Sequence, residues 1–515
     1  MSGSTTIATS PEPSAFRSAM AKAREMTDYL ESNAALAVEH SELERFAERE
    51  GRELLRRMLE GHYALRALAE RPVRVVGSDS VERTLRRPST RGLLTIVGRV
   101  EVPRLAYQAR GNSGLHPMDA ALNLPSELYS HEVRRRVAEQ AARSAFDEVA
   151  DALTKATGVS VGKRQIEQLA ARGATDFDAF YAARKFAPES PTDLLVLTFD
   201  GKGIPMRREG LRPETRRAAD NTPRRLRTRL TTGEKRHRKR MAQVAAVYAV
   251  APYVRTVQDV LAELRPVRDV DKDKKRPRPT QKRVWASVEK EPASIIDDAF
   301  TDALRRDPSK SRRWVVLLDG NRDQLRLVKE AARKHAVSIT ILVDLIHVLE
   351  YLWKAAYAFH AAATKEAEDW VQQRLLWLLR GEHGKVRQNL RRRACALEGD
   401  ALKPVTACLR YLKGVRRYLG YDEALGSGLP IATGVIEGAC RYLVKDRMEK
   451  TGARWSLAGA EAVLRLRALW ASHDFEDYWA FHLRVEYARH HQSLYAASTP
   501  PRPIPGIGPR IRRVK

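Results

Sequence analysis

Cysteine is scarce in this chain, with three residues among 515, and their placement excludes a common use of the residue. Cys395, Cys408 and Cys440 form no Cys-x-x-Cys pair and show no zinc-ligand spacing. The pattern implies no structural metal. It fits a reducing compartment in which the three thiols are small buried side chains.

Long apolar runs are absent as well. No stretch of about 18 apolar residues occurs, as a membrane-spanning helix would need, and residues 1–16 lack the basic-then-apolar order of a secretion signal. We therefore expect a cytoplasmic, nucleoid-associated protein that has no membrane partner.

Acidic residues are few relative to basic ones. The chain has 64 Asp and Glu against 92 Lys and Arg, which leaves a formal net charge of +28. A basic surface gains free energy when it displaces counterions from phosphates, so nucleic acid is the expected partner and acidic lipid the weaker alternative. Solubility alone or a GC-rich genome would also favour arginine, but neither predicts such a surplus of positive charge.

The N-terminal third has a mainly helical pattern. Residues 16–71 predict two or three amphipathic helices, and residues 95–108 predict a short strand pair with Pro103 at an edge. Residues 145–171 predict a helix, a turn at Gly158 and a second helix, which resembles a helix-turn-helix. A small core is expected from the apolar residues of this motif, Val149, Leu153, Val159, Ile166 and Leu169. Helix pairs of this kind are also common in proteins that do not bind DNA.

Further along, apolar segments alternate with helical ones, which predicts an α/β core. Strand-like runs end at Asp200, Asp319 and Asp344, and residues 243–251 form another run. Helices are expected at 257–264, at 322–334, throughout 345–424, from about Gly434, and at 458–470. The basic segments 206–240 and 272–283 are interpreted as loops, and residues 499–515 as a disordered tail.

Three acidic residues form a candidate metal-binding set. Asp200 and Asp319 each follow an apolar run and precede a glycine, so the chain can turn and leave the carboxylate exposed. Glu437 starts a later helix that can pack against the same sheet. Phosphoryl transfer on DNA uses two divalent ions held by converging carboxylates, which fits this set.

The plainer explanation is that strand-end acids cap the next turn and that Glu437 is a surface residue; spacing alone does not decide between the two. Asp344 also ends a strand and is the rival second carboxylate. His347 lies three residues later, where it can share a helix face with Asp344.

Four segments, taken together and in this order, resemble the Kra-type insertion-sequence transposases (the IS-Kra-four family), which belong to the DDE class. They are DGKGIPMR at Asp200, LLDGNRDQ at Asp319, VDLIHVLEYLW at Asp344 and TGVIEGACRYLVKDRMEKTGARWS at Glu437. The resemblance extends from about Leu94 to Trp470.

This resemblance implies an α/β, RNase H-like mixed sheet with a large all-helical insertion, preceded by mainly helical DNA-binding domains. It assigns Asp200, Asp319 and Glu437 to catalysis and to holding two Mg²⁺ or Mn²⁺ ions. Asp344 and His347 match the supporting Asp-x-x-His element of the family. The implied activity is metal-dependent cleavage of DNA at the element ends and strand transfer into a target, that is, transposition of a mobile element by DNA recombination.

We interpret the chain as seven segments. These are a disordered start (1–15), a helical N-terminal region (16–90), a strand pair with a helix-turn-helix-like region (91–186), the first part of the catalytic core (187–345), the helical insertion (346–424), the second part of the core (425–485) and a basic tail (486–515).

Basic and polar residues close to these motifs are the expected contacts to double-stranded DNA, both terminal repeats and target. They are Lys163, Arg164, Gln165, Lys202, Arg207, Arg208, Lys235, Arg236, Arg238, Lys239, Arg240, Arg441, Arg447 and Arg454. Trp455 next to Arg454 either clamps a base or packs in the core. Paired element ends imply at least a homodimer.

Two other functions remain open at this point. An RNase H-like nuclease that cuts but never joins DNA would use the same three acids. A silent DNA-binding regulator derived from a transposase would need none of them, although all three are present.

Overall fold

The computed structural model describes residues 15–187, 190–222, 226, 228, 237–264, 276–432 and 434–505. Residues 1–14 and 506–515 of the predicted disordered ends (1–15 and 499–515), and part of each basic loop, lie outside these residues. The prediction is wrong for the end of the described tail, where the Pro503 carbonyl accepts from the Arg71 amide at 2.7 Å and Ile504 is buried. The chain divides into two compact units, which we describe separately: unit 1 is 1–182 with 475–515, and unit 2 is 183–474. None of the helices in the described ranges is both long and apolar enough to span a bilayer.

Unit 1 begins with the predicted amphipathic helices and continues with a hairpin. The helices are α1 (Arg17–Glu31), α2 (Asn33–Leu36) and α3 (His40–Ala69), and the strands are β1 (Leu85–Thr95) and β2 (Gly98–Gln108). β1 and β2 pair antiparallel over their whole lengths. The hairpin is therefore longer than the predicted pair, because the polar and proline-containing start of β1 gives no apolar alternation to detect.

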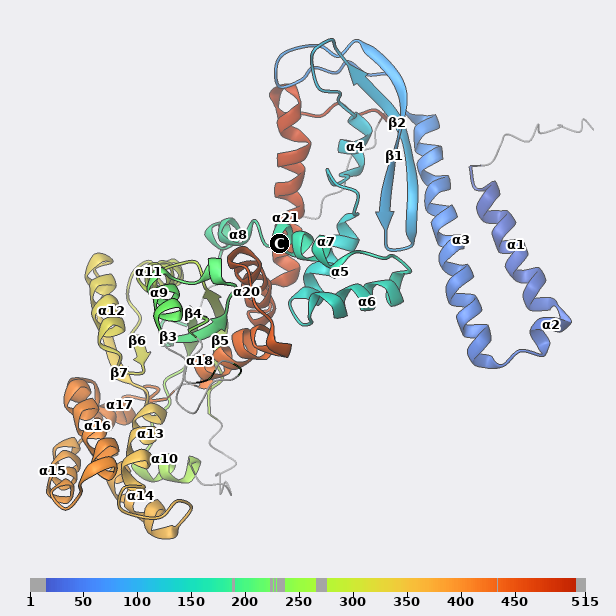
Figure 1. The fold of residues 1–515 in the computed structure, drawn as a ribbon. Coiled ribbons are helices and arrows are strands. Elements are labelled where there is room, and N and C mark those ends of the chain that lie inside the picture. The colour runs from blue at the N-terminus through green and yellow to red at the C-terminus, as the bar shows by residue number, and fades with distance from the viewer. Residues whose placement is uncertain are drawn as a thin grey trace, which may run out of the picture. The chain divides into compact units, whose positions relative to one another are not determined.

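The predicted helix, the turn at Gly158 and the second helix are present in unit 1. After α4 (Pro117–Leu122) come α5 (His131–Ala141), α6 (Phe146–Thr157) and α7 (Lys163–Gly173), which Figure 1 shows close together. Gly158 ends α6 in the left-handed conformation, at φ 69°. All five predicted core residues are buried in one cluster with Val133 and Val137 of α5.

The end of the chain also belongs to unit 1. Helix α21 (Phe475–His490) packs with α5, α7 and α8 (Phe177–Ala183) through buried polar and aromatic side chains. Tyr495 then forms a β-bridge to Gly77. The prediction that 475–485 complete the catalytic core and that a basic tail begins at 486 is therefore corrected.

Unit 2 contains a five-stranded mixed sheet in the order β5-β4-β3-β6-β7. The strands are β3 (Leu194–Pro205), β4 (Lys239–Val250), β5 (Thr280–Ser287), β6 (Trp314–Leu318) and β7 (Ile339–Val343). β3, β4 and β5 are antiparallel neighbours, whereas β6 and β7 run parallel to β3. This mixed sheet flanked by helices is compatible with the expected RNase H-like fold.

Several elements of unit 2 differ from the sequence interpretation. β5 falls in a segment interpreted as a basic loop, since Arg283 is buried beside Trp285 and bound to Asp302 at 2.6 Å. Helix α9 (Pro213–Asn221) lies in the other basic segment, and helix α11 (Pro292–Arg306) was not predicted. The helices α10 (Val257–Glu263) and α12 (Arg322–Lys334) match the predicted ranges.

The predicted helical insertion is present between β7 and the next core helix. It contains α13 (Leu345–Ala356), α14 (Lys365–Leu379), α15 (His383–Ala394), α16 (Gly399–Val415) and α17 (Tyr421–Gly426), grouped together in Figure 1. Its two ends meet, because the Leu345 amide donates to the Ile431 carbonyl at 2.9 Å. One apolar core joins these helices to the sheet residues Val196, Leu317 and Leu342.

The remaining helices of unit 2 follow this insertion. They are α18 (Gly434–Ala439), which starts where the sequence predicts, a π-helical turn (Cys440–Lys445), α19 (Asp446–Met448) and α20 (Leu457–Ala471).

Candidate active site

The strand register places three aspartates in one row. Thr198 of β3 pairs with Leu317 of β6, so Asp200 and Asp319 are level two residues later. Leu318 of β6 pairs with Val343 of β7, which brings Asp344 level with Asp319. Neighbouring strands are about 4.8 Å apart, and residues level on parallel strands share a face. The row therefore lies on the face that carries Val196, Leu317 and Leu342 of the core.

The chain around Asp200 differs from the prediction that it turns sharply after the aspartate. β3 continues to Pro205 because its pairing with β4 extends past the end of β6. A turn does follow Asp319, where Gly320 has a φ of +88°. A Cβ at Gly320 would lie 2.7 Å from a methyl of Val415, so both conformation and space require glycine there.

Asp319 and Asp344 have different surroundings. Asp344 is buried, and its Oδ1 caps α13 by accepting from the Ile346 amide at 2.8 Å. Asp319 is half-buried, its Oδ1 accepts from the Asn321 amide, and with Asp200 it lines a cleft of about 340 Å³. Asp319 is thus the more accessible of the two carboxylates.

Glu437 approaches the same row from α18, which packs on β3 and β4. Burial raises the pKa of Glu437, and the negative charges of Asp344, Glu350 and Asp200 raise it further, while His347 lowers it. Glu437 itself is exposed, and Asp319 is not among the charged groups with the largest effect on its pKa. The cleft that Asp200 and Asp319 line does not include Glu437.

Two contacts of the row were not predicted from sequence. The Cys440 thiol donates to Oδ2 of Asp200 at 3.1 Å, and burial together with Asp200 raises the pKa of this thiol far above its usual range. The Tyr411 hydroxyl donates to the Asp319 carbonyl at 2.8 Å from the insertion. Cys440 was expected to be only a small buried side chain. Its place in the π-helical turn, a conformation frequent at functional sites, gives no sequence signal.

The donor set fits a hard divalent cation. Asp200, Asp319 and Glu437 offer carboxylate oxygens, the ligands that Mg²⁺ and Mn²⁺ prefer. No ion pair joins these three acids to a lysine or arginine within the described parts of the chain. Among the described residues, however, the ligand atoms of Asp200, Asp319 and Glu437 do not all lie within 4.8 Å of one another, so a shared ion would require these side chains to move closer.

The predicted DNA contacts differ in exposure. Lys163, Arg164 and Gln165 are exposed at the start of α7, and Arg207, Arg208, Arg441 and Arg454 are also exposed. Arg208 is held by Asp220, and Lys239 forms an ion pair with Glu449. Lys202 lies close enough to Cys440 to lower its pKa. Arg238 is half-buried, and Lys235 and Arg236 lie outside the described residues.

Three further predictions concern side chains that are buried or half-buried. Arg447 is 2% exposed and packs over Trp455, so it cannot be the surface phosphate contact we expected. Arg240 donates to the backbone carbonyls of Val288 and Gly210, which gives it a structural role instead. Trp455 is buried and donates to the Met448 carbonyl, so it packs in the core and does not clamp a base.

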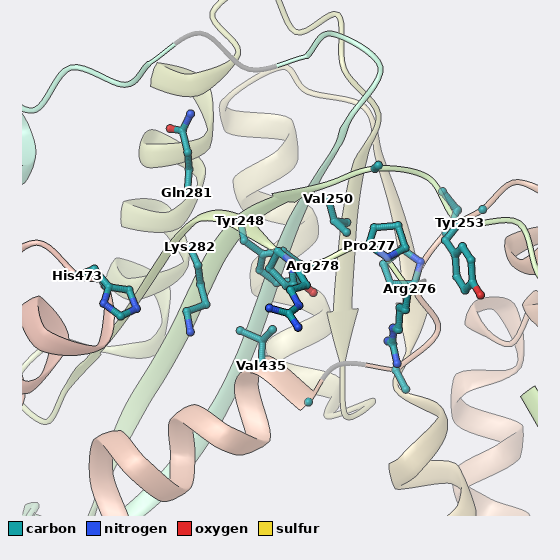
Figure 2. Close-up of a pocket in the computed structure, with 18 of the residues that line it drawn as sticks. Tyr248, Val250, Tyr253, Arg276, Pro277, Arg278, Gln281, Lys282, Val435 and His473 are labelled. Atoms are coloured by element: carbon teal, nitrogen blue, oxygen red, sulfur yellow. The ribbon is translucent and has the colours of Figure 1, made fainter. Parts of the chain in front are cut away.

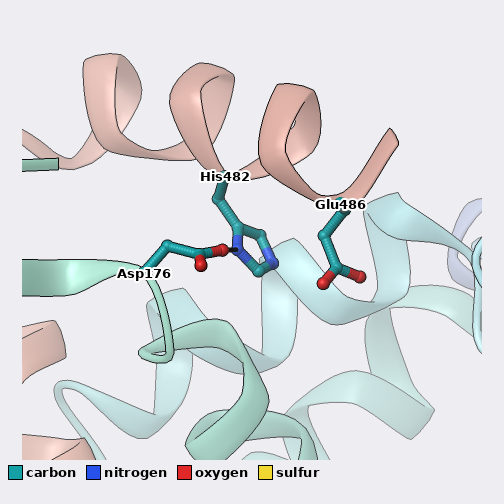
Figure 3. Close-up of side chains that lie close together, drawn as sticks. All are labelled: Asp176, His482 and Glu486. Atoms are coloured by element: carbon teal, nitrogen blue, oxygen red, sulfur yellow. Dashed lines mark hydrogen bonds and ion pairs between the residues drawn. The ribbon is translucent and has the colours of Figure 1, made fainter. Parts of the chain in front are cut away.

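Unit 1 has a second cluster of metal-ligand types, Asp176, His482 and Glu486 (Figure 3). Asp176 accepts hydrogen bonds from His482 and Arg489, and Glu486 accepts from Arg134 at 2.9 Å and from Arg489. Burial raises the pKa of both acids, but these partners outweigh it and lower both. Two guanidinium groups already balance the two carboxylates, which leaves no deficit of positive charge for a metal to fill.

No protein-family model matches the chain, and no curated protein sequence matches it. Among solved structures, a chain of the Drosophila P element transposase strand transfer complex is similar at 8% sequence identity and a TM-score of 0.25. The match covers 68% of this chain and 80% of that one. A TM-score of this size does not establish a shared fold or function.

Proposed function

We propose that this chain is a DDE-type transposase of a bacterial insertion sequence. In this proposal it binds the element ends in double-stranded DNA, cuts a phosphodiester bond there and joins the freed 3′-hydroxyl to a target phosphate. It acts as a homodimer or higher oligomer on DNA.

The observation that carries the proposal is the row of carboxylates. Asp200 and Asp319 are level on adjacent parallel strands, and both line one cleft. Glu437 lies within electrostatic reach of the same row. The net charge of +28 and the order of the four motifs support DNA as the substrate.

Asp200, Asp319 and Glu437 would hold two Mg²⁺ or Mn²⁺ ions. When bound, these ions supply charge stabilisation for the attacking and leaving oxygens of an in-line phosphoryl transfer. The Cys440 thiol and the Gly201 amide, at 3.1 and 2.6 Å from the two oxygens of Asp200, fix the orientation of that carboxylate. Asp344 caps the start of α13, the helix that carries His347.

Exposed basic residues would hold the DNA backbone, while α7 supplies sequence reading. Lys163, Arg164 and Gln165 stand at the first turn of the second helix of the helix-turn-helix-like pair, where such proteins contact base edges. Arg207 and Arg208 lie just beyond β3, a few residues after Asp200.

The test is cleavage and strand transfer with labelled DNA that carries the ends of the element. Asp200→Asn, Asp319→Asn and Glu437→Gln should each lower the cleavage rate about a thousandfold, a loss of about 4 kcal/mol of transition-state stabilisation, with DNA binding retained. Asp344→Asn should keep measurable cleavage. Glu366→Gln, which removes an exposed acid from α14, is the matched control and should cut like the parent.

Each alternative has its own outcome in this experiment. A parent protein that cuts but never joins the cut end to a plasmid would be a nuclease. If the parent binds DNA and never cuts it with Mg²⁺ or Mn²⁺, the catalytic proposal is wrong. Full activity of Asp319→Asn with an inactive Asp344→Asn would move the second metal ligand to Asp344.

A further inference from the structure

A second, larger cavity of unit 2 has a lining that the proposed active site does not use. Its volume is about 1080 Å³, and it is lined by the ends of β4 and β5, the segment 276–279, residues of 428–432, Gly434, Val435 and the turn at His473 (Figure 2). Its described lining residues include five arginines and lysines and no aspartate or glutamate. The cavity is therefore a concentrated positive site in a chain that also carries 64 acids.

Some of the basic side chains of this cavity are paired with acidic residues, and others are not. Arg255 is buried and pairs with Glu263, and Arg184 is bound to Asp474. Arg276 and Arg278 are exposed, and no ion pair joins them to any acid in the described ranges. Lys282 is half-buried, and its ammonium lies 5.8 Å from the ring centre of Tyr442. In Figure 2 Arg278 and Lys282 lie on either side of Val435, inside the cavity.

Aromatic groups and fixed backbone complete the walls. Tyr253 is half-buried in the lining, and its amide donates to the Gly428 carbonyl at 2.9 Å. Gly428 has a φ of +70°, and a Cβ there would lie 2.8 Å from the Tyr253 nitrogen, so this wall tolerates no larger residue. Tyr442 has a hydroxyl without a hydrogen-bond partner among the described residues.

The size of the cavity and the side chains that line it indicate which class of ligand it can bind. Its volume is that of a pocket enclosing a small molecule, so a DNA duplex does not enter, whereas a few nucleotides of one strand do. Cations that follow a phosphate backbone beside exposed aromatic rings are the usual means of holding a single strand.

The cavity also adjoins the proposed chemistry. Gly434 and Val435 line it, and Glu437 follows on the same helix, α18. We propose that this cavity binds an unpaired DNA strand next to the cleavage site, with Arg276, Arg278 and Lys282 on its phosphates and Tyr253 against a base. The choice of DNA as ligand rests on the proposed function, but binding here needs neither metal nor cleavage.

The test is binding of a short fluorescent oligothymidylate, followed by anisotropy without divalent ions. The triple variant Arg276→Ala, Arg278→Ala, Lys282→Ala should bind at least about tenfold more weakly than the parent. For this variant, a plot of the logarithm of the affinity against the logarithm of the salt concentration should also be less steep, with a slope smaller by about 2. This is the change expected when three contacts to single-strand phosphates are lost. The control triple Lys365→Ala, Arg391→Ala, Arg392→Ala removes the same charge from the insertion and should change affinity less than about threefold.

Tyr253 provides an independent readout. Tyr253→Ala should weaken oligothymidylate binding about tenfold, and Tyr253→Phe should bind like the parent, because stacking needs only the ring. Equal losses of affinity in both triple variants, or an unchanged salt dependence, would show that the oligonucleotide is held by the overall charge of the protein and not by this cavity. Either result would overturn the proposal. Tight binding of a free nucleoside triphosphate with no gain for the oligonucleotide would overturn it in favour of a mononucleotide site.

The same assay separates this proposal from the catalytic one. Asp200→Asn should bind the oligothymidylate like the parent whether or not the parent cuts DNA. An active parent whose cavity triple binds normally would refute the strand pocket alone. A parent that never cuts, but whose cavity triple loses binding, would refute the catalytic proposal alone.

Discussion

Two sets of acidic residues, one in each unit, differ in the charges around them. In unit 1, Asp176 and Glu486 are paired with Arg134, Arg489 and His482. In unit 2, Asp200, Asp319 and Glu437 form no ion pair with a described lysine or arginine. A cluster that supplies its own cations holds helices together, whereas acids without paired cations can accept a cation from solution, as the proposed function requires.

The largest effect that tests this comparison is on the stability of unit 1. Arg134→Met would leave the Glu486 carboxylate buried without its partner, and we expect the free energy of unfolding to fall by about 3–5 kcal/mol in urea titrations. Arg135→Met removes the neighbouring arginine, which is partly exposed and paired with the exposed Glu476, and should cost less than about 1 kcal/mol. Similar losses for both variants would show that the cluster is no more than a surface ion pair.

Metal binding should distinguish the two clusters directly. Mn²⁺ at a hundred times its dissociation constant should stabilise the parent by about 2.7 kcal/mol, measured as a shift of the calorimetric unfolding transition. Asp319→Asn should lose this shift, because it removes one of the proposed ligands. Glu486→Gln should keep the Mn²⁺-induced shift. A loss of Mn²⁺ binding in that variant would show that the metal binds the cluster of unit 1 instead.

Acid should weaken unit 1 through His131, which faces Arg134, Glu486 and His482. Burial lowers the pKa of His131 from 6.5 to about 3, and the charge of Arg134 acts in the same direction. In the unfolded chain the His131 imidazole therefore binds a proton below pH 6.5, whereas in the folded chain it stays neutral down to about pH 3. The stability that is present above pH 6.5 is lost as the pH falls toward 3. The parent should lose about 2 kcal/mol more than His131→Gln between pH 7.5 and 5, at about 1.4 kcal/mol per unit.

Urea titrations at the two pH values measure this difference. His40→Gln, at an exposed position on α3, is the matched control and should follow the parent. Equal pH dependence of the parent and His131→Gln would mean that this imidazole is hydrated in the folded state.

The smallest effect concerns Cys440 in the other cluster. Cys440→Ala removes the donor to Asp200 and should slow DNA cleavage by up to about tenfold, whereas Cys440→Ser keeps a donor and should stay closer to the parent. Equal rates for all three proteins would show that the thiol only fills space.

Sequence reasoning succeeded where one local pattern decides the structure. The periodicity of α12 and the glycine at the end of α6 predicted those elements correctly. The runs before Asp319 and Asp344 identified β6 and β7, and their level pairing then follows from the parallel register. The roles of the acids remain predictions.

Long-range contacts account for what was missed. β5 is stabilised by Arg283 binding Asp302 and by pairing with β4, neither of which its own sequence displays. Cys440 contacts Asp200 across 240 positions of the chain. The burial of Arg447 depends on Trp455, so its charge alone gave a wrong prediction.

The two ends of the helical insertion lie next to each other, which affects how such a chain could lose the insertion. Since Leu345 and Ile431 are hydrogen-bonded neighbours, a deletion that joins them would leave the strands and α18 in register. Yet Leu352, Leu375 and Leu412 of the inserted helices share a core with the sheet, and Tyr411 binds the Asp319 carbonyl. A relative that lacked the insertion would need another cover for that apolar face, so the insertion is a structural part of unit 2 and not an optional attachment.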